Sequence, residues 1–286
     1  MKLADTHTIY RADCYQVLDF KCHCDFCSVS NEEYNSSFSM SFIRKGFFGY
    51  RTFKREDEVH VGRMLLSKPG FVHTTRHIDN HPDFVTIYDF KKAFFDELVE
   101  TYTTQASWFL QNNDIHSVVI NATPELEYRH HLIYQQLLSN KYNSLQIDEM
   151  VLSLLEKSIF VLANNNNVPA IVSDKLKQYH LTTIESARDY LLSHFSENIS
   201  LQQLARHCLV SPFHFSRLFK SIVGQSPHQY LNGIRLVHAK HILAGSSLPV
   251  TDIAYECGFN SLEHFVTAFK QYYKINPTAM RGQLVS

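Results

Sequence analysis

The sequence predicts an α+β protein with a strand-rich N-terminal domain and an all-helical C-terminal domain. Residues 38–90 alternate apolar and polar side chains with the period of β-strands, and turns containing Gly or Pro divide them. From residue 200 onward, apolar side chains recur with the helical period, and one pattern of two helices occurs twice. We therefore expect an N-terminal antiparallel β-barrel with trailing helices and a C-terminal all-α double helix-turn-helix domain.

The expected strands succeed one another with no helix between them. Phe38, Met40 and Phe42 alternate with serine, and Lys45-Gly46 marks the turn into the next strand. Further short strands end at glycine-containing turns, and the last strand covers residues 84–90. Consecutive short strands of this kind form a small antiparallel barrel or sandwich.

Helical apolar stripes follow the strands. Each stripe is either ordinary core packing or a surface on which a second copy of the chain packs. The pattern predicts these helices over residues 94–102, 125–138 and 144–162.

A linker is expected between the two domains. Residues 163–174 contain four successive Asn residues and Pro169, and they have no hydrophobic periodicity. We therefore place the first domain at residues 1–162 and the second at residues 175–286. A helix starting near Thr182 is expected to begin the second domain.

Charge is distributed unevenly along a chain whose composition is otherwise ordinary. Hydrophobic residues make up 44% and charged residues 19% of the 286 residues, as in globular proteins of two domains. Before Asp174 there are 16 basic against 21 acidic residues, and from Asp174 onward 11 against 7. The basic balance of the second half fits a surface that faces phosphate.

The sequence favours a cytoplasmic protein with no membrane partner. No apolar run approaches the length that spans a bilayer, and residues 1–13 lack the apolar core of a signal peptide. In that compartment the six cysteines are expected to be reduced thiols rather than disulfides.

One pattern of residues occurs at 200–227 and again at 250–277. The second copy has one extra residue in its turn. The matching positions of the two copies are Leu204 and Ile253, Ala205 and Ala254, Cys208 and Cys257, Ser211 and Ser261, His214 and His264, Phe215 and Phe265, Phe219 and Phe269, Lys220 and Lys270, and Pro227 and Pro277.

The first copy has the signals of a short helix, a tight turn and a second helix. Ser200 with Gln203 forms a capping-box pattern, and Ser211 followed by Pro212 is an N-cap with proline in the first helical position. Apolar residues recur at i, i+3, i+4 and i+7 from Phe215, so the second helix has one buried stripe. In a helix-turn-helix motif, this second helix enters the DNA major groove.

With that stripe facing inward, a set of mostly polar residues faces outward. Arg217 is the natural base reader, because its planar guanidinium can pair with both acceptors of a guanine edge. Lys220 is expected to hold phosphate, and Phe213 suits a thymine methyl or a sugar. Alternatively, the face is simply solvated. The outward residues are Pro212, Phe213, Ser216, Arg217 and Lys220.

Residues from about 180 to 281 resemble the DNA-binding domain of the AraC/XylS family of bacterial transcription regulators. Both copies of the repeat carry the resemblance, together with Arg235, Ala239 and Leu243 in the segment that joins them. The resemblance implies two helix-turn-helix units on one linking helix, with recognition helices in successive major grooves. It also implies that the outward positions contact bases.

The second copy departs from the family at its outward positions. Many family members carry Arg where this chain has Thr267, so we expect less guanine recognition from the second unit. Glu263 is expected to accept a hydrogen bond from a cytosine amine, and Lys270 to contact phosphate. The outward residues are Leu262, Glu263, Val266, Thr267 and Lys270.

A second departure concerns the end of the second recognition helix. Lys274 stands where the first copy has Gly224. Glycine tolerates the left-handed backbone that ends many helices. We therefore expect this helix end to be strained or to end differently.

The order of turns in the first domain resembles the cupin-like effector domain found N-terminal in many AraC-type regulators. The resemblance implies that a small-molecule, metal or redox effector acts on this domain. It also implies double-stranded promoter DNA, RNA polymerase and a second copy of the chain as partners.

A cluster of cysteines distinguishes the first domain. Cys22, Cys24 and Cys27 could supply thiolates to one Zn²⁺. The histidine that completes a tetrahedral site could be His23, His73, His77 or His81. The cysteines could equally form a reversible thiol sensor. A third possibility is that they are buried small apolar residues.

We expect a regulator and not an enzyme. The rival from another class is a cupin-type metal enzyme with an appended DNA-binding domain, which would need two or more His and a carboxylate at one metal. A further alternative is a ligand-independent regulator whose first domain only dimerises.

Overall fold

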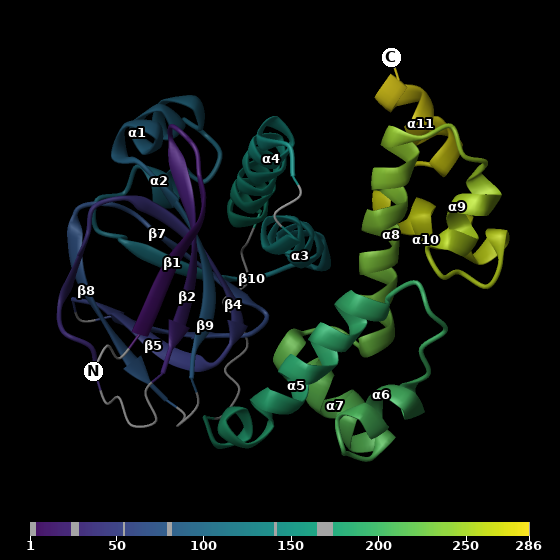
Figure 1. Ribbon diagram of the computed structural model, residues 1–286, viewed down its shortest axis with the longest axis horizontal. Coiled ribbons are helices and arrows are strands. Elements are labelled where there is room, and N and C mark those ends of the chain that lie inside the picture. Colours follow the sequence, from purple (N-terminus) through teal and green to yellow (C-terminus); the bar gives the residue numbers. More distant parts are fainter. Residues whose placement is uncertain are drawn as a thin grey trace. The chain divides into compact units, whose positions relative to one another are not determined.

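The computed structural model divides the chain into a mixed unit at residues 1–185 and a helical unit at residues 186–286 (Figure 1). The predicted α+β fold is therefore confirmed. Residues 165–173 of the predicted linker lie outside the described residues. The structure describes residues 4–23, 29–53, 55–78, 82–139, 142–164 and 174–285.

The strands of the first unit form two antiparallel sheets. The six-stranded sheet has the order β1-β2-β9-β4-β7-β10, and the four-stranded sheet has the order β3-β8-β5-β6. The cupin-like barrel is thus open, with two separate sheets. The strands are β1 Ala4–Arg11, β2 Tyr15–Cys22, β3 Glu33–Asn35, β4 Phe38–Lys45, β5 Phe47–Thr52, β6 Arg55–His60, β7 Arg63–Ser67, β8 Phe71–His77, β9 Phe84–Phe90 and β10 Ser117–Asn121.

Strand β7 of the six-stranded sheet is buried on both faces. On β7, Met64 and Leu66 pack with the helices, whereas Leu65 between them packs with the four-stranded sheet. A strand covered on both faces is a continuous apolar run. On β4, the face with Phe38 and Met40 packs in the helical core. The opposite face carries Ser39, whose hydroxyl shares a hydrogen bond of 2.6 Å with Ser67. β4 therefore alternates serine with apolar residues, whereas β7 does not.

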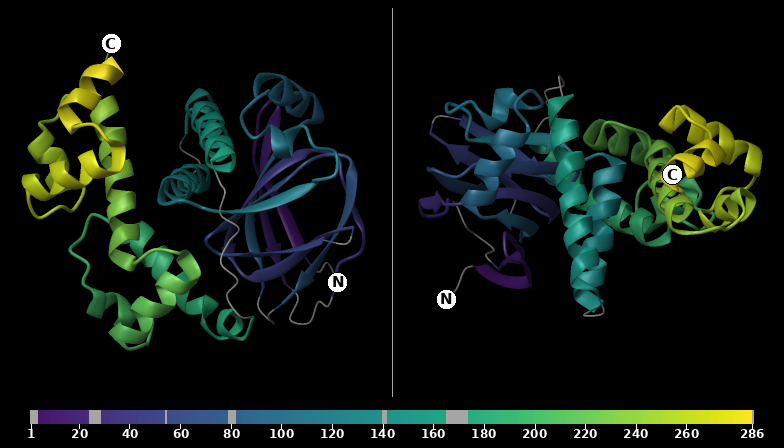
Figure 2. Two further views of the ribbon diagram at one scale, coloured as in Figure 1. Left: turned by 180° about the vertical axis from the view of Figure 1, so that it is seen from behind. Right: turned by 90° about the horizontal axis from the view of Figure 1, so that it is seen from above.

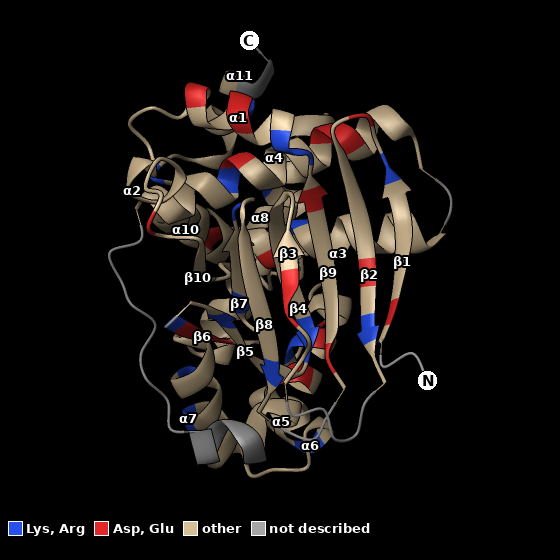
Figure 3. Ribbon diagram, turned by 90° about the vertical axis from the view of Figure 1, so that its left-hand side faces the viewer, with Lys and Arg blue, Asp and Glu red and all other residues tan. Residues whose placement is uncertain are grey.

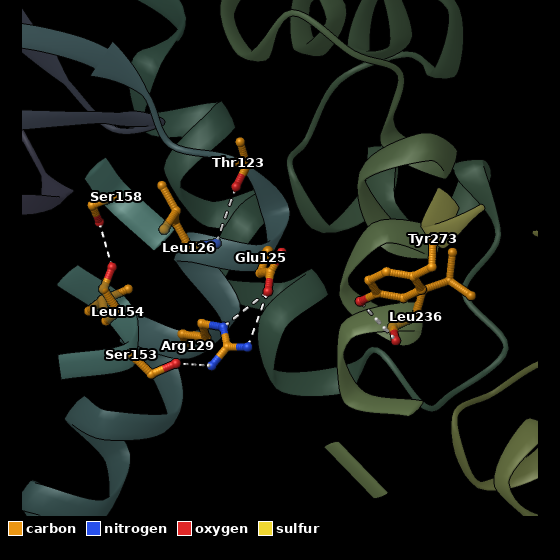
Figure 4. Close-up of polar contacts among 9 residues, drawn as sticks. All are labelled: Thr123, Glu125, Leu126, Arg129, Ser153, Leu154, Ser158, Leu236 and Tyr273. Atoms are coloured by element: carbon orange, nitrogen blue, oxygen red, sulfur yellow. Dashed lines mark hydrogen bonds and ion pairs between the residues drawn. The ribbon is translucent and has the colours of Figure 1, made fainter. Parts of the chain in front are cut away.

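Helices cover the second face of the six-stranded sheet. Figure 2 shows α3 and α4 side by side. Between them, Arg129 donates a hydrogen bond of 3.2 Å to Ser153 while it also pairs with Glu125 (Figure 4). The helices are α1 Lys92–Thr101, α2 Ser107–Leu110, α3 Pro124–Ser139 and α4 Ser144–Ala163.

The remaining helices contain the repeat. The helix expected to begin near Thr182 begins at Asp174. The helices are α5 Asp174–His194, α6 Leu201–His207, α7 Pro212–Val223, α8 Pro227–Gly245, α9 Val250–Glu256, α10 Leu262–Tyr273 and α11 Pro277–Val285. The repeated pairs are α6 with α7 and α9 with α10, and α8 joins them.

Five strands of the N-terminal unit were not predicted from the sequence: β1, β2, β3, β8 and β10. β1 lies at the sheet edge and leaves most of its side chains exposed or half-buried, so it has little apolar alternation. β10 is a short apolar run of five residues, which periodicity does not distinguish from a loop or a helix.

Candidate DNA-binding interface

The first helix-turn-helix copy consists of α6 and α7, and both helices are capped as the sequence predicts. Ser200 Oγ accepts from Gln203 N at 3.1 Å, and the Gln203 side chain accepts from Ser200 N at 2.8 Å. Ser211 Oγ accepts from His214 N at 3.4 Å, and Pro212 occupies the first turn of α7. These caps fix where the recognition helix starts, and hence which side chains lie on its first turn.

The two turns have the same backbone geometry despite their different lengths. Val210 N donates to Ala205 O, and Phe259 N donates to Ala254 O, each at 3.0 Å. The residue before each donor is left-handed: Leu209 has φ +56° and Gly258 has φ +83°. Leu209 is 92% exposed, so its conformation is held by the backbone and not by side-chain packing.

The recognition helices also end alike. Gly224 N donates to Lys220 O at 3.0 Å, and Lys274 N donates to Lys270 O at 2.9 Å. Gly224 has φ +84° and Lys274 has φ +62°, so both ends are left-handed. The lysine therefore adopts the backbone that glycine favours, which is a strained conformation for a residue with a Cβ.

Phenylalanine pairs hold each recognition helix to its unit. Phe215 and Phe219 are fully buried, with ring centroids 5.6 Å apart. The equivalent Phe265 and Phe269 are fully buried at 5.5 Å. The inward stripe predicted from the helical period is therefore the buried one, and the opposite face of each helix is exposed.

Arg235 on α8 connects the start of the helical unit to its second half. Its guanidinium donates to Phe195 O and Glu197 O, each at 2.7 Å, and lies 5.8 Å from the Phe259 ring. Burial lowers the pKa of this guanidinium, and the two carbonyls satisfy its donors. Gly258 must lack a side chain here, because a Cβ would lie 2.6 Å from Ser196 O.

The outward residues of α7 are exposed or half-buried. Arg217 and Lys220 are exposed, and Phe213 is 74% exposed. The Arg217 guanidinium lies over the Phe213 ring, 5.7 Å from its centroid. Stacking restricts the long Arg side chain while leaving its fork of donors open. Pro212 is exposed as well, and Ser216 is half-buried.

Fewer of the outward residues are exposed on α10 than on α7. Glu263, Thr267 and Lys270 are exposed. Leu262 and Val266 are half-buried because they pack against the apolar core of the second unit. Direct contact with DNA from this helix would therefore come mainly from its polar residues.

Comparison with known proteins identifies this helical unit. A family model described as a helix-turn-helix domain matches residues 204–283. Regulatory protein PocR of Salmonella typhimurium is 32% identical over 105 residues, which cover 37% of this chain and 35% of PocR. The HTH-type transcriptional activator RhaS of Yersinia pestis is 38% identical over 96 residues, which cover 34% of this chain and 35% of RhaS.

The helical unit contains a helix-turn-helix domain of the AraC type. The matched segment spans about a third of the length of the curated relatives. Among solved structures, the C-terminal domain of AraT, a response regulator from Geobacillus stearothermophilus, is 32% identical with a TM-score of 0.35. The match covers 35% of this chain and 84% of the AraT domain.

The AraC-type domain also contains histidines that sequence reasoning did not single out. His228 at the start of α8 and His264 on α10 are exposed, and their rings are nearly parallel, with centroids 6.5 Å apart. His264 also packs against Phe259. The signal in the sequence was the matching of His214 with His264 in the two copies. Imidazole N–H groups at these positions are further donors beside the recognition helices.

The cysteine cluster is only partly described. Cys24 and Cys27 lie outside the described residues. Cys22 is buried, and its Sγ lies 3.7 Å from Nε2 of His77. His73 lies earlier on the same strand and stacks on Tyr50, with ring centroids 4.6 Å apart. The structure thus brings His77, and not His73, to Cys22.

His77 has a carboxylate on its other side, since its Nδ1 lies 2.8 Å from Asp83 Oδ2. Among the described residues, no group of three or more His, Cys, Asp or Glu side chains is placed to hold a metal ion. The cysteines of the described ranges are free thiols. Burial raises the pKa of Cys257 to about 12, so this thiol serves packing.

None of the helices in the described ranges combines the length and the apolar character that crossing a membrane requires.

Proposed function

We propose that this chain is a sequence-specific DNA-binding transcription regulator, and not an enzyme, in which an effector acting on the N-terminal domain controls DNA binding. One observation carries the proposal: two recognition helices, each capped by a serine, expose Arg217, Lys220 and Lys270 on matching faces of α7 and α10. α8 joins the units with 19 residues, a length of roughly 28 Å. Successive major grooves lie about 34 Å apart, so one linking helix of this size suits adjacent grooves.

Within this proposal, the two recognition helices make different contacts with the DNA. Arg217 reads a guanine edge, held over Phe213, and Lys220 and Lys270 hold phosphates. Glu263 accepts from a cytosine amine, and Thr267 contributes a weaker contact. Pro212 and Ser216 approach the sugar and phosphate of the first half-site, whereas Leu262 and Val266 contribute their exposed edges.

The second copy of the chain is proposed to pack on α4. Three large apolar side chains of α4 are exposed, namely Leu145 at 67%, Leu152 at 39% and Phe160 at 60%. Leu145 and Leu152 are seven residues apart, the heptad spacing that places side chains on one seam between two helices. A homodimer through this stripe would bring two DNA-binding domains to one promoter.

The remaining partners follow from the AraC-type domain and are part of the proposal. RhaS is an activator by name. We propose that this chain likewise activates transcription in the cytoplasm by contacting RNA polymerase. We also propose that Cys22, Cys24 and Cys27 form a metal or thiol sensor. The contact of Cys22 with His77 favours His77 over His73 as the histidine of this sensor.

A selection experiment tests the proposed function. Full-length protein is used to enrich random duplex DNA, and the enriched sequences are measured by fluorescence anisotropy against a scrambled duplex. We expect a two-part site with its conserved blocks one helical turn apart, bound at least a thousandfold more tightly than scrambled DNA. Equal affinity for all duplexes would overturn sequence-specific recognition.

Metal analysis and thiol titration of the purified chain separate the proposal from the cupin-type enzyme. That rival requires stoichiometric metal bound by histidine and carboxylate ligands. Metal that is lost when Cys22 is changed to serine would support a thiolate sensor instead. Stoichiometric metal retained in the Cys22→Ser, Cys24→Ser and Cys27→Ser variants would favour the enzyme.

A further inference from the structure

A cavity of about 450 Å³ opens at one end of the N-terminal domain. The turn between β1 and β2, the turn between β3 and β4, and the start of α1 form its walls. In Figure 3, the C-terminal ends of β1 and β9 lie at the same end of the six-stranded sheet. The residues that matter for its chemistry are Arg11, Tyr15, Gln16, Asp89, Lys91 and Lys92.

The acidic residue of the cavity wall is already engaged. Gln16 Nε2 donates to Asp89 at 2.9 Å, and the Ser37 hydroxyl donates to the other oxygen of the same carboxylate. Gln16 Oε1 accepts in turn from Arg11 at 3.2 Å. The network uses one guanidinium nitrogen of Arg11 and leaves further donors of its fork open toward the cavity.

The basic residues outnumber this carboxylate. Lys91 has no hydrogen bond or ion pair from its ammonium group among the described residues, and it lies at the N-cap of α1. Lys92 pairs with Asp96 at 2.7 Å. The first turn of α1 contains no acidic residue and receives no side-chain cap. Since Lys92 is balanced by Asp96, Arg11 and Lys91 face the single carboxylate of Asp89. The cavity therefore keeps a net positive charge, reinforced by the free N–H groups of the helix start.

We propose that this cavity binds a small organic carboxylate, and that this ligand is the effector of the regulator. Arg11 pairs with the carboxylate through its planar fork, and Lys91 supplies the second charge. The half-open cavity is large enough for a ligand of a few carbon atoms beyond the head group. The effector role rests on the proposed regulatory function, whereas the binding site does not depend on it.

The cavity is connected by hydrogen bonds to α4, the helix with the exposed apolar stripe. Tyr15 lines the cavity and is itself buried, and its hydroxyl donates to Asp148 Oδ1 on α4 at 2.6 Å. Tyr10 donates to the same oxygen at 2.8 Å. A ligand that shifts the Tyr15 ring thus shifts the hydroxyl that positions α4, the helix proposed to carry the dimer surface.

Thermal unfolding of the full-length chain with defined probes tests the binding site. The probes are succinate and benzoate, compared with succinamide and benzamide at equal ionic strength, with inorganic phosphate as a separate arm. We expect the carboxylates to raise the melting temperature and the amides to leave it unchanged, because only the anions bind the folded state. Phosphate is expected to act more weakly, because it has no carbon skeleton to pack on the apolar atoms of the cavity wall.

Substitutions of Arg11 and Lys91 test whether the carboxylate binds in this cavity. Arg11→Ala and Lys91→Ala should each weaken succinate or benzoate binding on the order of tenfold in calorimetric titration. Arg55→Ala, which removes an exposed charge from another part of the same domain, should leave the affinity within about twofold. Equal stabilisation by amides and carboxylates, stronger binding of phosphate, no binding of any probe, or unchanged affinity in both cavity variants would overturn the proposal.

The link to α4 has its own readout. Tyr15→Phe keeps the ring and removes the hydroxyl that reaches Asp148, so its carboxylate affinity is measured first and the two proteins are then compared at equal fractional saturation. Sedimentation velocity should show a carboxylate-dependent change in dimerisation for the natural chain and none for this variant. An identical response of both proteins would overturn the link. Failure of carboxylate binding alongside intact binding to the selected duplex would overturn this inference while leaving the proposed function standing.

Discussion

Arg217 combines exposure with a restrained side chain, and these are the two properties that base recognition requires. The Phe213 ring beneath its guanidinium reduces the rotamer freedom that would be lost on binding. We expect Arg217→Ala to cost about 1–3 kcal/mol on the selected site and to relax preference at one base pair. Anisotropy titrations against single-base variants of the site measure this. A loss of the same size on every sequence would assign Arg217 to phosphate.

Lys68 in the N-terminal domain is a buried cation whose charge affects stability. Its ammonium donates to Phe109 O at 2.8 Å and to Asn112 O at 2.6 Å, which ties the α2 region to the end of β7. Burial lowers its pKa to about 8 from the ordinary value near 10.5. The unfolded state therefore binds more protons between these two pH values, so the free energy of unfolding rises with pH there.

Lys68→Met isolates this contribution. Relative to the variant, the natural chain should gain stability as the pH rises from about 8 to about 10.5, and the difference should be flat below about 8. Denaturant titrations of both proteins at several pH values measure the difference. A difference that is flat across this range, or that falls with pH, would show that burial does not depress the pKa.

At the scale of helices and turns, two residues store backbone strain in the DNA-binding domain. Leu209 and Lys274 are left-handed and carry a Cβ, whereas Gly258 and Gly224 occupy the matching positions of the other unit. Leu209→Gly and Lys274→Gly should each stabilise the domain by about 0.5–1 kcal/mol, measured by denaturant unfolding. Gly224→Ala is the control: its Cβ meets nothing within 4 Å, so it should cost about 1 kcal/mol from backbone strain alone.

The exposed stripe on α4 leads to a prediction about assembly. Leu152→Glu should convert a dimer into a monomer, because it places a charge in the apolar seam between two copies. Leu248→Glu is the matched control, since Leu248 is 40% exposed against 39% for Leu152 but lies in the DNA-binding domain. Sedimentation velocity measures both. Equal masses for the two variants would place the dimer surface elsewhere.

For the whole molecule, the central expectation is that both helix-turn-helix units bind one duplex. Lys220 and Lys270 occupy equivalent places on the two recognition helices and are both exposed. Each change to alanine should reduce the slope of log affinity against log salt by about 1, and the double variant by about 2. Affinities measured at four or more salt concentrations give the slopes. An effect from Lys220 alone would mean that the second unit does not contact the DNA.

The helical domain was predictable from sequence because its signals are local. The caps at Ser200 and Ser211 and the repeated phenylalanines each depend on residues a few positions apart, so the sequence contains them directly. The first domain was less predictable. The edge strand β1 has no strong alternation, and the run on β7 reflects burial on both faces, which depends on elements distant in the chain.

The sequence by itself determined the repeat, the caps and the helical stripes, and with them the AraC-type domain and the outward position of Arg217. Tertiary structure alone decided that Cys22 meets His77, that Leu262 and Val266 are half-buried, and that Arg11 and Lys91 line one cavity connected through Tyr15 to α4. The reason is that helix periodicity and capping depend on near neighbours, whereas sheet pairing and loop convergence join residues far apart in the chain.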